Sequence, residues 1–190
     1  MKDLKRKIHY WCSDTMQNKI TGKGVVCAVL DTGITQHPDL VGRIVGWKDC
    51  VQGKKTIYDD NGHGTHVAGI IGATFDNGKG VCGVAPNAKL YGANWKNGDG
   101  GKFYYTQKAA LGYLVQKKHC RVLNLSFSIG GYGLRYSASQ GGKKAQENFN
   151  ILNADLTEFL DDLEKNTGNS FLICKSADND NDKLFYKKDK

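Results

Sequence analysis

The sequence predicts an α/β domain in which a doubly wound, mostly parallel sheet carries helices on both faces. Three observations lead to this prediction. Residues 24–34 contain an apolar run flanked by glycine and ending on Asp31, as in a strand buried on both faces of a parallel sheet. Residues 59–69 begin as a polar turn bracketed by glycine and continue into small and apolar residues, which indicates a closely packed helix. Further apolar runs at residues 89–95 and 121–128 have the character of additional buried strands.

Length and composition limit the class of protein. The 190 residues, of which 39% are hydrophobic and 24% charged, are typical of one globular domain. No run reaches the roughly 18 apolar residues of a membrane span, so no membrane partner is expected. Residues 1–10 lack the apolar core of a signal peptide, which favours a cytoplasmic location and leaves secretion open. The net charge of +8 comes from lysines scattered over loops, so we expect a solvated basic surface and no nucleic-acid partner.

The remaining segments predict the order of elements. Residues 1–21 form a charged lead-in, and strands are expected at residues 44–51 and 170–177. Apolar residues at helical spacing predict helices over 104–118 and from Leu152 to about Thr167. Residues 129–150 are polar and rich in glycine, which indicates a surface insertion. Six cysteines are present without zinc-ligand spacing, and because Cys27 and Cys174 lie inside apolar runs, free thiols are expected.

Two titratable residues stand where α/β sheets place their chemistry. Asp31 is at the carboxyl end of the first strand, the edge at which open sheets hold ligands and catalytic groups. His63 stands at the mouth of the helix that follows. In the simpler interpretation Asp31 caps a turn and His63 is a packing or surface histidine. In the functional interpretation the carboxylate of Asp31 orients the imidazole of His63 and stabilises its protonated form.

These stretches carry a resemblance to a known family. Four segments carry it: VLDTGI at 29–34, HPDL at 37–40, DNGHGTHVAG at 60–69 and GVAP at 83–86. Their order and spacing resemble those of the subtilases, the subtilisin-like serine peptidases, from about Ile20 to Asn179. The resemblance implies a serine endopeptidase on a subtilisin-like sheet, with an extended peptide or protein as its substrate.

The resemblance assigns roles by position in this sequence. Asp31 matches the catalytic acid, His63 the general base and His66 a second, structural histidine on the same helix. Asn179 matches the side-chain donor to the oxyanion. Asp178 stands where the family has glycine, which adds a negative charge beside that donor.

Substrate-binding residues follow from the same resemblance. The glycine-rich segment that contains Gly98 and Gly100 matches a segment that pairs with the substrate backbone as an added strand, although by itself it would be interpreted as a turn. The opposite wall of the groove matches Ser126, Phe127 and Ser128, and Ser128 stands where the family usually has glycine.

A calcium site is also implied by the resemblance. The side chains of Asp39 and Asn77 would join the backbone carbonyls of Phe75, Lys79 and Val81 around the ion. An ordinary Asn-Gly turn at residues 77–78 is the alternative interpretation.

One element of the family pattern is missing from the sequence. The nucleophilic serine of the family lies in a GTSMA segment well beyond the oxyanion asparagine, and no serine of this chain stands in such a segment. We therefore expect residues 1–190 to be the amino-terminal two-thirds of one catalytic domain, incomplete at its carboxyl end and inactive alone. Hydrolysis would then need a complementing carboxyl-terminal piece. The alternative is a pseudoprotease that binds peptides or proteins in the surviving groove.

Overall fold

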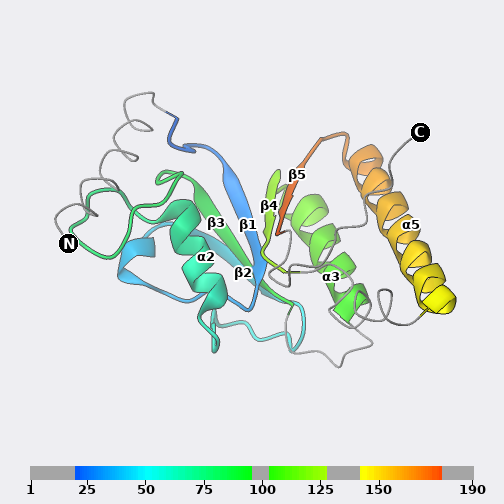
Figure 1. The fold of residues 1–190 in the computed structure, drawn as a ribbon. Coiled ribbons are helices and arrows are strands. Elements are labelled where there is room, and N and C mark those ends of the chain that lie inside the picture. The colour runs from blue at the N-terminus through cyan, green and yellow to red at the C-terminus, as the bar shows by residue number, and fades with distance from the viewer. Residues whose placement is uncertain (1–19, 96–102, 128–141, 177–190) are drawn as a thin grey trace.

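A parallel sheet forms the centre of the molecule. The computed structural model describes residues 20–95, 103–127 and 142–176. The five strands of its sheet have the order β2-β3-β1-β4-β5, and all four neighbouring pairs are parallel. The strands are β1 (Val26–Asp31), β2 (Ile44–Asp49), β3 (Lys89–Asn94), β4 (Val122–Leu125) and β5 (Leu172–Lys175). This arrangement confirms the predicted fold class (Figure 1).

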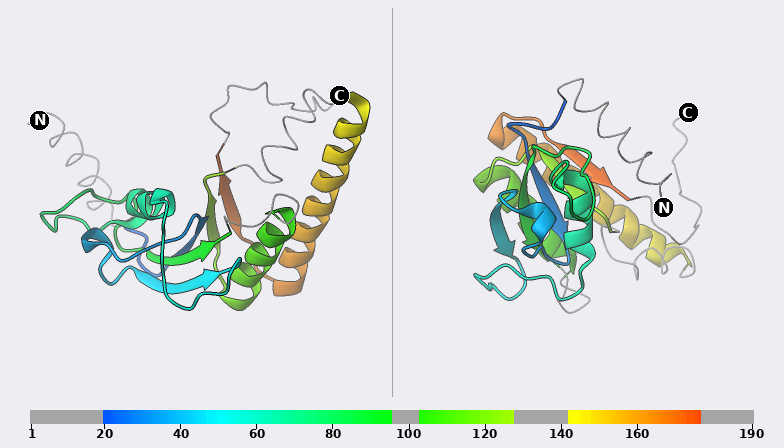
Figure 2. Two further views of the ribbon diagram at one scale, coloured as in Figure 1. Left: turned by 90° about the horizontal axis from the view of Figure 1, so that it is seen from below. Right: turned by 90° about the vertical axis from the view of Figure 1, so that its left-hand side faces the viewer.

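Helices cover both faces of the sheet. They are the short η1 (Pro38–Leu40), α2 (His63–Gly72), α3 (Phe103–Gly112) with its continuation η2 (Tyr113–Lys117), and α5 (Gly142–Thr167). Figure 2 shows α2 on one side of the sheet and α3 and α5 on the other. No helix in the three described ranges is long and apolar enough to cross a membrane.

The central strand β1 has apolar side chains on both faces. Ala28 and Leu30 belong to the core cluster formed with α3, η2 and α5, whereas Cys27 and Val29 pack in the cluster that contains Ala68 of α2. Side chains alternate between the faces of a strand, so a strand covered on both faces is apolar throughout. This explains the continuous apolar run in the sequence.

Helix α2 lies close to the sheet because its inner face has almost no side-chain bulk. Gly64, Ala68 and Gly72 are four residues apart and all buried. A Cβ atom on Gly72 would lie 3.3 Å from Leu90 of β3, so this position leaves little room for a larger residue. The predicted close packing of the helix is therefore present.

Three polar residues meet at the carboxyl ends of neighbouring strands. Asn94 of β3 pairs in register with Asp31 of β1 and with Asp49 of β2, and all three are buried. The Nδ2 of Asn94 donates to the hydroxyl of Tyr58 at 2.6 Å, and that hydroxyl donates to Asp49 at 3.0 Å. Burial opposes ionisation of Asp49, but hydrogen bonds from the backbone of Gln52 and its neighbours outweigh it and lower its pKa.

Several element boundaries differ from the sequence prediction. The strand expected over 44–51 ends at Asp49, the strand expected over 170–177 spans Leu172–Lys175, and the helix expected over 104–118 is divided between α3 and η2. Helix α5 begins at Gly142, so the last nine residues of the segment 129–150, predicted as a surface insertion, are helical. Those residues contain the helix formers lysine, alanine, glutamine and glutamate, whose preference the count of polar residues did not weigh. Residues 1–19 and 129–141 lie outside the described ranges.

The cysteines within the described ranges divide into two groups. Cys27, Cys50, Cys120 and Cys174 are free thiols, as expected. Burial raises the pKa of Cys27 to about 12 and that of Cys120 to about 11, so both behave as small apolar residues. Cys82 is disulfide-bonded, and the expectation of a free thiol was wrong at this position. Unlike Cys27, it lies in a loop after α2 and is only half-buried.

Helix α5 packs on the core through the buried side chain of Leu163, with Phe159 and Leu160 partly buried against the same cluster. Leu163 is 1% exposed and belongs to the cluster around Leu114 and Leu123. We predict that Leu163→Ala lowers the free energy of unfolding by about 2–5 kcal/mol, because it removes buried methyl groups and leaves a cavity. Urea denaturation followed by circular dichroism measures the change. Ile151→Ala, on the same helix at 64% exposure, is the control and should stay within about 0.5 kcal/mol of wild type. Equal effects of the two substitutions would contradict this packing.

Candidate active site

Asp31 and His63 form a hydrogen-bonded pair at the carboxyl edge of the sheet. Asp31 is the last residue of β1 and His63 the first of α2. The Nδ1 of His63 lies 2.7 Å from the Oδ1 of Asp31. The Asp31 side chain is 2% exposed and the His63 side chain 52%. Since an ionised carboxylate only accepts hydrogen bonds, the proton is assigned to Nδ1, which leaves Nε2 as an acceptor on the open side of the ring.

A glycine allows the helix to bring the imidazole this close. A Cβ atom on Gly64 would lie 2.1 Å from the carbonyl oxygen of Gly33 and 3.0 Å from the Cβ of Asp31. Any larger residue would therefore separate the first turn of α2 from the end of β1. The backbone N–H of Gly64 also donates to the hydroxyl of Thr32 at 3.0 Å.

The carboxylate of Asp31 has one further donor. The backbone N–H of Thr32 donates to Oδ1 at 2.7 Å, so this oxygen accepts from both Thr32 and His63. Among the described residues, no donor reaches the buried Oδ2. A buried carboxylate with an open lone pair is suited to stabilise a positive charge on the adjacent imidazole.

A second acid, Asp59, connects the loop after β1 to the start of α2. Its carboxylate accepts hydrogen bonds from the hydroxyls of Thr32 and Thr65, at 2.8 and 2.6 Å. We did not identify this residue from the sequence. The available signal was an acid shortly before a helix whose N-cap, Gly62, has no side chain to cap it.

Part of the proposed substrate groove lies beside the pair. The backbone N–H of Trp95, which follows β3, donates to the carbonyl of Asp31 at 3.3 Å. The ring of Trp95 packs against that of Phe127 with centroids 4.1 Å apart. The hydroxyl of Ser126 accepts from the Nδ2 of Asn124 at 2.9 Å. Ser126 and Phe127 thus lie at the same edge of the sheet as Asp31.

The other residues predicted for the site lie outside the described ranges. These residues are Gly98, Gly100, Ser128 and Asn179. Their predicted roles in substrate and oxyanion binding remain predictions.

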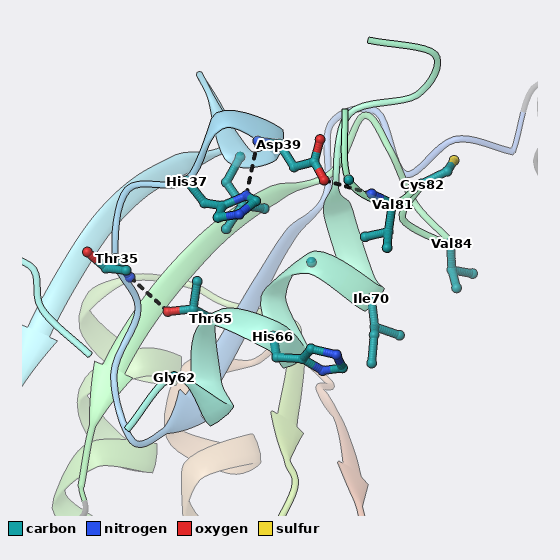
Figure 3. Close-up of a pocket in the computed structure, with 13 residues that line it drawn as sticks. Thr35, His37, Asp39, Gly62, Thr65, His66, Ile70, Val81, Cys82 and Val84 are labelled. Carbon is teal, nitrogen blue, oxygen red and sulfur yellow. Dashed lines mark hydrogen bonds between the residues drawn. The ribbon is translucent and has the colours of Figure 1, made fainter. Parts of the chain in front are cut away.

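The residues predicted to bind calcium surround Asp39. The carboxylate of Asp39 accepts from the Nδ2 of Asn77 at 2.9 Å and from the backbone N–H of Val81 at 2.8 Å, the latter drawn in Figure 3. The Oδ1 of Asn77 accepts from the backbone N–H of Lys79 at 2.9 Å. No group of three acidic, histidine or cysteine residues that could hold a metal ion occurs in the part of the chain described.

The hydrogen bonds around Asp39 link its carboxylate to the loop itself. Calcium takes six to eight oxygen ligands, whereas both oxygens of Asp39 face N–H donors and Asn77 presents its nitrogen to the carboxylate. The contacts favour the alternative interpretation, a turn closed by its own hydrogen bonds. The backbone supports this, because Gly80 has φ +40° and a Cβ there would collide with Asp39.

An apolar hollow lies beside α2. Its volume is about 850 Å³, and its lining includes Ile70, Val81 and Val84, which are about half exposed. Figure 3 shows these three side chains on the same side of α2, while the Thr35–Thr65 hydrogen bond lies further along the hollow. Gly62, the residue before His63 in the sequence, also lines the hollow.

The parallel sheet with a buried acid and an exposed imidazole at its carboxyl edge defines a class of protein. It is the class of α/β proteins that carry an acid–base pair for chemistry at that edge.

The chain belongs to the subtilase family, because the sequence model described as "Subtilase family" matches residues 22–189.

Relatives of known identity agree with this assignment. "Serine protease AprX" of Bacillus subtilis strain 168 is 40% identical over 126 residues, which are 64% of this chain and 28% of that protein. "Subtilisin BL" of Lederbergia lenta is 53% identical over 81 residues, 43% of this chain and 29% of that protein. The solved structure of the "S41 Psychrophilic Protease" has a TM-score of 0.53 and 28% identity, over 82% of this chain and 46% of that one. The chain therefore matches less than half the length of each of these relatives.

The contact between Gly64 and Gly33 leads to a prediction. Gly64→Ala should lower the free energy of unfolding by about 1–3 kcal/mol, because the added methyl group must displace backbone. Gly69→Ala is the matched control in the same helix, where the added Cβ would meet only Val81 at 3.8 Å. It should stabilise the helix by up to about 1 kcal/mol. Thermal unfolding of both variants measures this, and a tolerated alanine at position 64 would contradict the close approach.

Proposed function

We propose that this chain supplies the acid and the general base of a subtilisin-like serine endopeptidase. The observation that carries this proposal is the 2.7 Å contact between Asp31 and His63, with Nε2 on the exposed side of the ring. The reaction is the hydrolysis of peptide bonds. A serine outside residues 1–190 supplies the nucleophile, so the chain alone is inactive.

The proposed reaction passes a proton through His63. The Nε2 of His63 accepts the proton of the serine hydroxyl as that oxygen attacks the peptide carbonyl, and then returns it to the leaving amine. Asp31 holds the ring with Nε2 unprotonated and stabilises the imidazolium that forms. Asn179 is the proposed side-chain donor to the developing oxyanion.

Substrate binding is proposed along the carboxyl edge of the sheet. An extended peptide pairs with the segment of Gly98 and Gly100 on one side and with residues 126–128 on the other. The position of Trp95 and Phe127 supports this assignment, because their rings contact each other and the backbone N–H of Trp95 donates to the carbonyl of Asp31.

The hollow beside α2 supports complementation by a second piece. Its half-exposed residues Ile70, Val81 and Val84 form an apolar surface next to the helix that carries His63. Apolar surface of this kind is typical of an interface. A piece that docks there would bring its residues near the imidazole.

A chimera tests the proposed reaction. The full chain is joined to the remainder of AprX that follows the matched region, and hydrolysis of a chromogenic peptide anilide is measured. We predict hydrolysis that is lost in His63→Ala and reduced on the order of 10⁴-fold in Asp31→Asn, because the imidazole then loses its tautomer. The chain alone should not react with a serine-directed phosphonate.

Three outcomes distinguish the alternatives. A chimera that unfolds cooperatively but hydrolyses nothing would contradict the enzymatic proposal. If the chain is instead a peptide-binding module, its affinity for an extended peptide should be unchanged in His63→Ala. Labelling of any serine in the chain alone would contradict the proposal that the nucleophile comes from outside.

The calcium prediction is tested by stability. Because the loop around Asp39 is closed by N–H donors, we predict the same unfolding temperature in calcium chloride and in a chelator. Differential scanning calorimetry of the full chain measures it. A calcium-dependent rise that disappears in Asp39→Asn would contradict this assignment and support the ion site that the resemblance implies.

A further inference from the structure

We propose that Asp59 is the positioning residue that aligns the imidazole of His63 with Asp31. The inference rests on the proposed function in one respect, since it takes the Asp31–His63 pair as the acid and base. Asp59 itself does not contact the imidazole in the described structure. It acts on the two backbone segments that carry the pair.

Five donors converge on the Asp59 carboxylate. Its Oδ1 accepts from the hydroxyl of Thr32 at 2.8 Å, from the N–H of Gly62 at 2.9 Å and from the N–H of Asn61 at 3.3 Å. Its Oδ2 accepts from the N–H of Thr65 at 2.8 Å and from the hydroxyl of Thr65 at 2.6 Å. Burial opposes ionisation, but the hydrogen bonds, foremost those of Thr65, outweigh it and lower the pKa of Asp59.

The partners of Asp59 flank the two members of the pair. Thr32 follows Asp31 directly, and its own N–H donates to the carboxylate of Asp31 at 2.7 Å. Thr65 lies two residues after His63, in the first turn of α2. The carboxylate of Asp59 therefore joins the end of β1 to the start of the helix within one hydrogen-bonded unit.

The charge on Asp59 also fixes the direction of two hydroxyl groups. Because the Thr32 hydroxyl donates to Asp59, its lone pairs are free to accept the N–H of Gly64 at 3.0 Å. Because the Thr65 hydroxyl donates to Asp59, it can accept the N–H of Thr35 at 3.1 Å. An amide at position 59 would offer a single acceptor oxygen and turn an NH₂ group toward donors.

The first turn of α2 depends on these contacts for its own backbone. Gly62 provides no side-chain cap, and the N–H groups of Gly64 and Thr65 are satisfied by Thr32 and Asp59. A negative charge at this end of a helix is favourable as well. Loss of Asp59 should therefore let the first turn, and with it His63, move away from Asp31.

Proton NMR of the full chain, labelled with ¹⁵N-histidine, tests the alignment directly. The Nδ1 proton of His63 should appear as a strongly deshielded resonance, identified by its absence in His63→Ala. In Asp59→Asn we predict that this resonance is lost or exchanges with water at least tenfold faster. Asp49→Asn is the matched control, because Asp49 also accepts several backbone N–H bonds, and its hydrogen-bond partners in the described ranges lie outside α2.

Two threonine variants keep the test decisive if Asp59→Asn does not fold. Thr32→Ser keeps the hydroxyl and should keep the resonance, whereas Thr32→Val should lose it. An unchanged resonance and exchange rate in Asp59→Asn, or in Thr32→Val, would overturn the proposal and leave Asp59 as a helix cap only. This readout does not require hydrolysis. Failure of the chimera would therefore contradict the proposed function and leave the proposal about Asp59 unaffected.

In an active chimera the same variant separates positioning from binding. Asp59→Asn should lower kcat by about 10²-fold, because a base misplaced by about 1 Å transfers protons poorly, while KM stays near wild type. A change in KM alone would contradict a positioning role.

Discussion

The hydrogen bond between Asp31 and His63 is the interaction on which the site depends. It joins the end of the central strand to the first residue of a helix, at 2.7 Å. The small residues of α2, the glycine pair at positions 33 and 64, and the polar residues around Asp59 all act on this one distance. These features carry a cost in stability. Glycine is unfavourable inside a helix, and an ionised carboxylate is unfavourable in a buried position.

Two acids near the polar edge of the sheet, Asp49 and Asp59, both accept several hydrogen bonds, but from different segments. Asp49 gathers backbone N–H groups and Tyr58 on the β2 side, and Asp59 gathers threonine hydroxyls and helix N–H groups on the α2 side. Both keep a lowered pKa because hydrogen bonds outweigh burial. Asp31, at the end of β1, keeps an oxygen without a donor among the described residues. In the three described ranges, Asp31 is the acid hydrogen-bonded to the imidazole, so it is the one placed to respond to the charge on His63.

The fold and the family were predicted from the sequence because their signals are local. The apolar run of residues 24–34 could be recognised as a buried strand, and the glycine spacing of α2 as a closely packed helix. Asp31 and His63 were recognised because each stands at the end of an element. Asp59 was missed because its partners come from two segments that only the fold brings together. Helix α5 was predicted to begin ten residues too late, because polar composition does not distinguish an exposed helix from a loop.

The state of the His63 ring tests the central claim most directly. The account requires that Nδ1 carries the proton and that Nε2 is free to accept one. ¹⁵N NMR of the neutral imidazole in the full chain distinguishes the two tautomers. We predict a protonated Nδ1 and an unprotonated Nε2 in the wild-type chain. A ring protonated at Nε2, with Nδ1 free, would contradict the account.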